Sequence, residues 1–339
     1  MFTGSPSMSP GELPGGAGSV GNDACPSPGS GVDKRGGHAL ERLRKPEWLK
    51  KPLPEPQAVN RMEGLLRQRH LHTVCESALC PNLGECFGKG TATFLIMGDA
   101  CTRDCRFCGV RSGLPSSLDP AEPAQVADAV RRLGLRHVVV TSVTRDDLPD
   151  GGASHYVATI RAVRQANPGV TIEVLVPDFG GRMQSVDSVV VEAPEVFNHN
   201  LETVFRLYPA VRPQAIYERS LAVLAHAVAA RRSLVKTGWM VGLGETHDEV
   251  EALLREVREA GVHIVTIGQY LRPSAGHLQV AEYVTPAEFE EYCQYGERLG
   301  LQVHAAPFVR SSFQAGENFE KARSRVRGGF GGEEEARCS

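Results

Sequence analysis

The sequence predicts an α/β protein built as a partial (β/α)6 barrel, preceded by an N-terminal extension with its own cysteine motif. Two observations lead to this prediction. Apolar strand-like runs alternate with amphipathic stretches from residue 93 onward, and six of the nine cysteines lie between Cys75 and Cys108. Near-continuous apolar strands separated by helices are typical of a parallel sheet buried on both faces. A doubly wound sheet would show much the same alternation, so the strand pattern alone does not choose between the two.

The strands of the expected barrel are short apolar runs bounded by turn-forming or polar residues. They are TFLIM (93–97), HVVVTSV (137–143), VTIEVLV (170–176), VVVEA with VFNHN (189–200), LVKTGWMVGL (234–243) and HIVTIGQYL (263–271), with VHAAPFV (303–309) as a further candidate. Polar side chains follow several of these runs, and catalytic residues in parallel barrels gather at the carboxyl ends of strands.

Helix starts are marked by three patterns with an N-cap residue and an acid three positions later. They are Asp119-Pro120-Ala121-Glu122, Thr246-His247-Asp248-Glu249 and Thr285-Pro286-Ala287-Glu288. After the first pattern, Val126, Val130 and Leu133 fall on one helical face and Gly134 can end the helix.

Composition divides the chain into five segments. Residues 1–45 are rich in Gly, Ser and Pro and are expected to be disordered, as is the tail at 323–339. Residues 46–92 form the expected extension with a cysteine motif. The barrel spans 93–300, and 301–322 is a separate C-terminal segment.

Length, charge and the N-terminus exclude several classes of protein. A chain of 339 residues can form one barrel domain. The formal charge of −3 gives no general attraction for nucleic acid or an anionic membrane, so neither partner is expected. No apolar run approaches the ~18 residues of a transmembrane helix. The N-terminus lacks a secretory signal and is a poor transit peptide, which favours the cytoplasm, where thiols stay reduced.

A C-x3-C-x2-C triplet, formed by Cys101, Cys105 and Cys108, follows the first expected strand. Three thiolates on one tight loop can bind three irons of a [4Fe–4S] cube and leave the fourth iron open. An open metal position is typical of a reactive site. The alternative is a zinc knuckle, which needs a fourth Cys or His nearby, and none follows before His137.

A second triplet, C-x4-C-x5-C, lies immediately upstream and is formed by Cys75, Cys80 and Cys86. Its position next to the first triplet indicates a second metal site. Disulfides do not fit a reducing compartment, and six thiols within 34 residues are poorly explained as buried apolar filler.

The two triplets in this order resemble the lipoyl synthase family of radical S-adenosylmethionine (SAM) enzymes. That family also carries a C-terminal Arg-Ser-Ser-Tyr motif, which Arg310-Ser311-Ser312-Phe313 matches except at its last position. The resemblance covers roughly residues 45–320. Further similar stretches are TSVTRDDLPDGGA (141–153), EVLVPDF (173–179), FNHNLET (197–203), KTGWMVGLGET (236–246), and TIGQYLRPS with HLQV (266–280).

The resemblance implies a partial (β/α)6 radical SAM barrel with two [4Fe–4S] clusters and SAM as cofactors. One cluster binds and cleaves SAM, and the other is an auxiliary cluster carried by the N-terminal extension. The implied ligands are Cys101, Cys105 and Cys108 for the first cluster, and Cys75, Cys80, Cys86 and Ser312 for the auxiliary cluster. Ser311 is the alternative to Ser312.

The implied activity is radical SAM sulfur insertion at C6 and C8 of a protein-bound octanoyl-lysine, with the auxiliary cluster as sulfur donor. The implied substrates are octanoylated lipoyl carrier domains of 2-oxoacid dehydrogenase complexes or the glycine cleavage H protein. An electron donor such as flavodoxin or ferredoxin and cluster-assembly proteins are the other implied partners.

The stretch Asn198–Glu202 also resembles biotin synthase, in which the second asparagine and the acid hold the ribose of SAM. This resemblance implies Asn200 and Glu202 as SAM ligands, and a carboxylate suits a ribose diol. Arg219 is a candidate partner of the SAM carboxylate. A surface arginine on a helix explains Arg219 equally well.

Four positions depart from the family pattern. Phe313 replaces a tyrosine, Thr144 an aspartate, Trp239 a smaller aliphatic residue and Gln279 a proline. Three alternatives stay open: a different radical SAM enzyme that inserts sulfur or rearranges its substrate, a zinc-stabilised binding protein, and a relative that binds SAM without turnover. Only the last is indicated by departures, those at Phe313 and Thr144.

Overall fold

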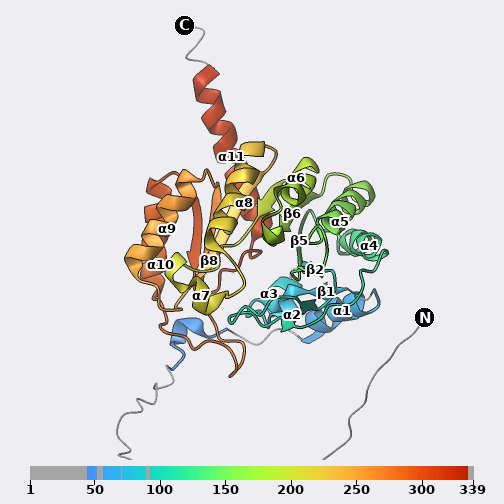
Figure 1. Cartoon of the computed structure of the whole chain (residues 1–339), viewed down its shortest axis with the longest axis horizontal. Coiled ribbons are helices and arrows are strands. Elements are labelled where there is room, and N and C mark those ends of the chain that lie inside the picture. Colours follow the sequence, from blue (N-terminus) through green and yellow to red (C-terminus); the bar gives the residue numbers. More distant parts are fainter. Residues whose placement is uncertain (1–43, 52–55, 70, 89–91, 335–339) are drawn as a thin grey trace, which may run out of the picture. The chain divides into compact units, whose positions relative to one another are not determined.

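The computed structural model describes residues 44–51, 56–69, 71–88 and 92–334 (Figure 1). The expected disordered segment at 1–45 thus lies almost wholly outside the described residues, as do residues 335–339. No helix in the described part of the chain is long and apolar enough to cross a membrane.

The central sheet has eight strands in the order β1-β2-β5-β6-β7-β8-β9-β10. Their bounds are β1 His72–Thr73, β2 Thr93–Ile96, β5 His137–Ser142, β6 Thr171–Leu175, β7 Val196–Asn198, β8 Leu234–Val241, β9 Ile264–Gln269 and β10 Gln302–Ala306. β1 pairs antiparallel with β2, and every other neighbouring pair is parallel. Two short strands, β3 Ala100–Cys101 and β4 Arg111–Ser112, pair separately.

The parallel strands follow one another in sequence order, each added at the same edge of the sheet. A doubly wound sheet would reverse its strand order at a switch point. The partial barrel is therefore confirmed, and the extra strand expected within 303–309 is present as β10.

Helices alternate with the strands and lie around the outside of the sheet (Figure 1). The helices between strands are α4 Glu122–Leu133, α5 Ala153–Ala166, α6 Met183–Val191, α7 Tyr208–Val211, α8 Tyr217–Ala230, α9 His247–Glu259 and α10 Pro286–Arg298. The extension holds α1 Pro56–Arg67, α2 Val74–Ser77 and α3 Leu83–Gly88, and α11 Ala315–Glu334 ends the described chain. Three 3-10 turns complete the structure: η1 Glu47–Leu49, η2 Phe179–Gly181 and η3 Phe205–Leu207.

Both predicted threonine capping boxes are present. Thr246 caps α9 and Thr285 caps α10, each with its acid bonded back to the cap residue. The capping pattern predicted at Asp119 is wrong, because α4 begins only at Glu122. Glu122 is instead drawn into the core, where its carboxylate accepts hydrogen bonds from the Met97 N–H at 2.8 Å and from His155 at 2.6 Å.

The predicted strand at 189–200 is only partly correct. Its first part, Val189–Val191, ends helix α6, and only Val196–Asn198 forms strand β7. The reason is periodicity: Val186, Val189 and Val190 are buried on one face at helical spacing, and the helix places all three in the core.

The segment from residue 323 is expected to be disordered, but helix α11 continues through it to Glu334. Its start packs against β5, where a Cβ on Gly316 would lie 3.1 Å from the Cβ of His137. Arg325 ties α11 to the turn after α10 through the Leu301 carbonyl at 3.4 Å. These attachments hold the helix against the barrel.

Candidate active site

The first cysteine triplet lies on β3 and the loop between β3 and β4, beyond the carboxyl end of β2. The Cys108 N–H donates to the Cys105 carbonyl at 3.0 Å, which closes a tight turn. Burial raises the pKa of the Cys108 thiol to about 12, and the charges of Cys105 and Cys101 act in the same direction. Thiolates that lie near one another repel, and a bound cation stabilises them, so the chemistry of this triplet suits iron.

The second triplet spans α2, the following turn and α3 in the extension. Burial raises the pKa of Cys75 to about 12, and the nearby charges of Cys80 and Cys86 raise it further. The two cysteine loops are in contact, because a Cβ on Gly109 would lie 3.3 Å from the backbone of Ala78. The two cysteine loops are therefore neighbours, although no three Cys, His, Asp or Glu side chains in the described part of the chain are already arranged to hold a metal ion.

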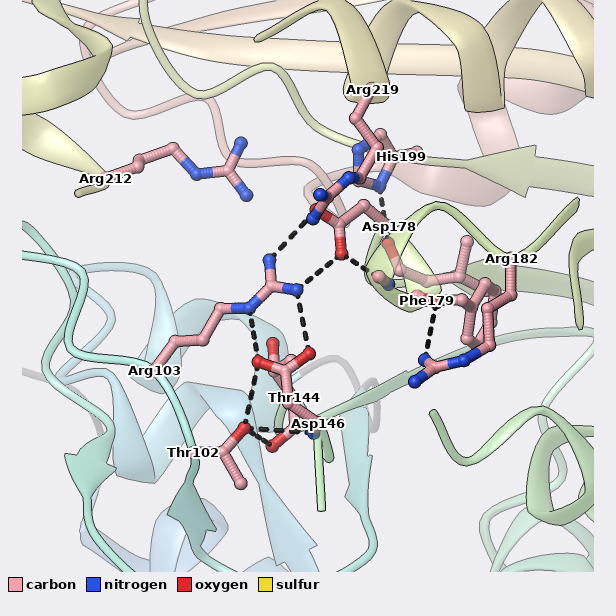
Figure 2. Close-up of polar contacts among 12 residues, drawn as sticks. Thr102, Arg103, Thr144, Asp146, Asp178, Phe179, Arg182, His199, Arg212 and Arg219 are labelled. Atoms are coloured by element: carbon pink, nitrogen blue, oxygen red, sulfur yellow. Dashed lines mark hydrogen bonds and ion pairs between the residues drawn. The ribbon is translucent and has the colours of Figure 1, made fainter. Parts of the chain in front are cut away.

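Arg103, inside the first cysteine loop, anchors that loop to the barrel (Figure 2). Its guanidinium binds both oxygens of Asp146 at 2.7 and 2.8 Å, in the loop after β5. It also binds both oxygens of Asp178, beyond the end of β6, at 2.6 and 3.0 Å. Two bidentate pairs leave the guanidinium little freedom of orientation.

Thr102 adds backbone contacts between the same elements. The Thr102 N–H and hydroxyl both donate to the Thr144 carbonyl, at 3.1 and 2.9 Å. The Thr144 N–H in turn donates to the sulfur of Cys101 at 3.3 Å. Since these Thr144 contacts all come from its backbone, the departure from the usual aspartate leaves them intact.

Glu202 sits next to the cysteine loop on the segment after β7. It adopts a positive φ of 68° and bridges to Trp239 of β8. Its charge acts on both Cys105 and Cys108, which places Glu202 beside the first triplet. Burial raises the pKa of Glu202, although Arg212 acts in the opposite direction. Hydrogen bonds from a ligand's hydroxyls would favour the ionised carboxylate.

Asn200 lies beside Glu202 and has one free acceptor. Its amide nitrogen donates to Glu202 Oε1 at 3.0 Å and to the Ser311 hydroxyl at 2.7 Å. Its Oδ1 is buried and has no hydrogen-bond partner among the described residues. A buried acceptor without a partner is costly, so this atom fits a hydroxyl donor of a bound ligand such as a ribose.

Arg212 is a site residue that sequence reasoning missed. It donates to the carbonyls of Asn200 and Leu201, at 3.1 and 3.2 Å. Burial would lower its pKa, but the charges of Tyr208, Glu202 and Cys105 raise it. Arg212 also donates to the hydroxyl of Tyr208, four residues earlier, at 3.2 Å. No motif in the sequence singles out Arg212.

Arg219 lies farther from the cysteines than expected of a SAM carboxylate partner. Its Nη1 is 3.5 Å from Asp178 Oδ2, on the opposite side of Asp178 from the cysteine loop (Figure 2). Both arginines are half-buried, but only the charge of Arg212 acts on Cys105. Of the three predicted SAM ligands, Asn200 and Glu202 lie near the first triplet. Arg219 is connected to the cysteine loop only through Asp178, which also binds Arg103.

The serine motif lies between the two cysteine loops and the barrel. The amide of Asn82, from the second cysteine loop, donates to the Phe308 carbonyl at 2.7 Å. Arg310 is half-buried; burial lowers the pKa of its guanidinium, while the charges of Cys80 and Glu202 act in the opposite direction. Arg310 therefore lies near a cysteine of the second triplet and near Glu202.

A loop after β9 covers the first cysteine loop from another side. His277 contacts the Cys108 carbonyl at 2.9 Å, and the Leu278 N–H donates to the Arg106 carbonyl at 3.1 Å. The predicted stretch 266–280 thus meets the cysteines directly. The position of Gln269–Arg272 at the carboxyl end of a strand predicts that this stretch shares the barrel mouth with the cysteines, but it does not single out His277 or Leu278.

Comparisons with known proteins agree with this geometry. Residues 95–257 match a family model described as the Radical SAM superfamily. The lipoyl synthase of Chlorobaculum tepidum is 55% identical over 279 residues, which cover 82% of this chain and 96% of the relative. That of Chlorobium limicola is 55% identical over 285 residues, with 84% and 97% covered. The chain belongs to the lipoyl synthase family.

As a member of the lipoyl synthase family, the chain is a radical SAM sulfurtransferase. The family implies a [4Fe–4S] cluster, SAM, and an octanoylated carrier protein as substrate. The crystal structure of the FeFe-hydrogenase maturase HydG from Carboxydothermus hydrogenoformans superimposes with a TM-score of 0.51 at 13% identity, covering 78% of this chain and 69% of HydG. That likeness supports the radical SAM fold alone.

Proposed function

We propose that this lipoyl synthase inserts sulfur at C6 and C8 of a protein-bound octanoyl-lysine and takes both sulfur atoms from a second [4Fe–4S] cluster. The observation that carries the proposal is the contact between the two cysteine loops at Gly109 and Ala78. A carbon radical made at one site needs a sulfur donor within reach, and adjacent loops supply that proximity.

In this proposal Cys101, Cys105 and Cys108 hold three irons of the first cluster. When bound, this cluster and SAM supply the radical that removes hydrogen from an unreactive carbon. Asn200 Oδ1 and Glu202 orient the ribose of SAM, and the unsatisfied state of Asn200 Oδ1 supports this role. The hydrogen bonds of Arg103 to its two aspartates fix the cysteine loop.

Cys75, Cys80, Cys86 and Ser312 hold the cluster that serves as the sulfur-donating substrate. Ser312 fits this role better than Ser311, because the Ser311 hydroxyl is already bound by Asn200 at 2.7 Å. Among the described residues, none is found to hydrogen-bond the Ser312 hydroxyl. A serine oxygen suits iron less well than a thiolate, so the iron it holds would be released most readily as the cluster is consumed.

The proposed division of the chain follows these roles. Residues 46–92 deliver the auxiliary thiolates, 93–300 form the catalytic barrel, and 301–322 return the serine to the auxiliary site. We further propose the partners implied by this activity: octanoylated carrier domains of 2-oxoacid dehydrogenase complexes or the glycine cleavage H protein, a flavodoxin or ferredoxin, and cluster-assembly proteins, all in the cytoplasm.

The test is anaerobic reconstitution with iron and sulfide, followed by SAM, a reductant and an octanoyl-lysyl peptide. The product peptide is analysed by mass spectrometry for wild type, Ser312→Ala and a control, Ser188→Ala, whose hydroxyl is exposed on α6. We expect a gain of two sulfurs for wild type and the control and none for Ser312→Ala.

The alternatives give different results. Cleavage of SAM without sulfur in the peptide would contradict the proposed substrate while leaving a radical SAM enzyme. A colourless protein that retains zinc would contradict the proposal that the two cysteine triplets hold iron–sulfur clusters. Full sulfur insertion by Ser312→Ala would contradict the role of that serine.

A further inference from the structure

A buried ion pair lies beneath the serine motif and has no part in the proposed chemistry. Lys236 of β8 donates from its Nζ to Glu173 Oε1 of β6 at 2.8 Å, and both side chains are only 1% exposed. The same Nζ also donates to the backbone carbonyl of Ser311. One buried cation thus joins the barrel interior to the C-terminal segment.

The surroundings of the pair are built to keep it charged. Asn198 of β7 donates to Glu173 Oε1 at 3.2 Å, and His137 of β5 lies 3.6 Å from Glu173 Oε2. Burial would raise the pKa of Glu173, but Lys236 and His137 hold it below its usual range. A fully buried ion pair is poor evidence for stability, because apolar residues of similar size often serve as well. Its retention therefore needs another explanation.

Two further contacts attach the same short segment to the barrel. Asn200 donates to the Ser311 hydroxyl at 2.7 Å. The Val309 carbonyl lies so close to β9 that a Cβ on Gly268 would stand 2.1 Å from its oxygen. Residues 309–311 are thus held from inside the barrel at three points.

We propose that Lys236 is a positioning residue for Ser312, the fourth ligand in the proposed auxiliary site. The Ser311 carbonyl belongs to the rigid peptide unit that ends at the Ser312 Cα. By fixing that carbonyl, Lys236 fixes the plane from which the Ser312 side chain departs. Glu173 accepts a hydrogen bond from the same Nζ, and the amide oxygen of a glutamine at this position can accept it as well. This inference rests on the proposed role of Ser312 and adds how the barrel sets its position.

The test isolates the auxiliary cluster in the full chain, in a background of Cys101→Ala, Cys105→Ala and Cys108→Ala. After anaerobic reconstitution, about four irons per chain belong to that cluster. Mössbauer spectroscopy then measures the fraction of iron with an oxygen ligand. The key variant is Glu173→Gln with Lys236→Met, which removes the lysine without leaving an unpaired buried carboxylate. Glu173→Gln alone is its matched control.

We expect Glu173→Gln to keep the oxygen-ligated iron and the double variant to lose it roughly tenfold, since a hydrogen bond from a charged donor contributes at least this factor. Three thiolates remain in both, so total iron should fall much less. Equal oxygen-ligated iron in the double variant and wild type would overturn the proposal. Equal loss in both variants would also overturn it, because the pair rather than the lysine contact would then be responsible.

Two further variants guard the interpretation. Ser312→Ala tests the ligand itself: if it keeps the oxygen-ligated iron, the proposed role of Ser312 fails whatever Lys236 does. Gly268→Ala displaces the Val309 carbonyl and leaves the ion pair intact, so it remains informative if the double variant does not fold. We expect Gly268→Ala to lose the oxygen ligand, and retention would contradict positioning through this segment.

Discussion

Arg103, which lies between two of the predicted cluster cysteines, binds both carboxylate oxygens of Asp178, a residue 75 positions away in the sequence, at 2.6 and 3.0 Å (Figure 2). The side chains are 5% and 1% exposed. The cysteine loop is therefore held by a buried ion pair rather than by its own turn alone. This connection makes the loop's position depend on the segment after β6, two strands along the sheet from β2.

Asp178→Asn should lower the free energy of unfolding by about 3 kcal/mol, because it leaves Arg103 with one buried carboxylate fewer. Urea unfolding of the metal-free protein measures this loss. The control Asp187→Asn breaks an exposed pair with His226 and should change stability by less than about 1 kcal/mol. Equal effects of the two variants would contradict a special role of the Arg103 pair.

Arg212→Leu should weaken SAM binding to the reconstituted enzyme by roughly tenfold, since it removes the cation beside Cys105 and Glu202. Arg219→Leu should weaken it by less than about threefold, because Arg219 contacts Asp178 from the outer side. Equilibrium dialysis with labelled SAM measures both. If Arg219→Leu weakened SAM binding more than Arg212→Leu, the result would support the sequence-based prediction that Arg219 binds the SAM carboxylate.

Stability should fall as the pH drops below about 6.5, partly through His199. Burial lowers the pKa of His199 to about 4, so the folded protein keeps it neutral where the unfolded chain binds a proton. Above the unfolded pKa, His199 causes no loss of unfolding free energy. As the pH falls from there to about 4, the free energy of unfolding decreases by ~1.4 kcal/mol per pH unit through this residue. His199→Asn should reduce the proton uptake on unfolding by about one between these limits. An unchanged slope would contradict a neutral buried histidine.

Phe313 stands where the family has tyrosine, and its ring lies 5.5 Å from the Nζ of Lys51. Lys51 also lies 4.7 Å from the Phe308 ring. A double-mutant cycle with Lys51→Met and Phe313→Leu should give a coupling of about 0.5–1 kcal/mol in stability. Phe313→Tyr keeps a π face and should leave both stability and cluster content unchanged. A loss of cluster in Phe313→Tyr would show that the phenylalanine is required.

Much of the fold could be predicted from sequence because its signals are local. The strand runs, the threonine capping boxes and the glycine after α4 each act within one element. The predicted capping box at Asp119 is wrong because the Glu122 carboxylate binds His155 instead of the cap residue. No local sequence pattern indicates that bond.

The residues of the candidate site also fall into two groups: those with a local sequence signal and those without one. The cysteine spacings and the stretch around Asn200 are local; the structure places the two cysteine loops in contact and Glu202 near Cys105. The contacts of Arg103, Arg212 and His277 depend on partners from distant elements, as in the 169 positions between Cys108 and His277. Side chains of this kind carry no spacing signal, so only the folded chain identifies them.

The central claim is that the second cluster supplies the inserted sulfur. The most direct measurement reconstitutes the enzyme with heavy-isotope sulfide, removes free sulfide, and runs one turnover on an octanoyl-lysyl peptide. We predict a product with two heavy sulfur atoms and a matching loss of iron from the auxiliary site. A product that carries light sulfur, or SAM cleavage that leaves the peptide without sulfur, would contradict the claim.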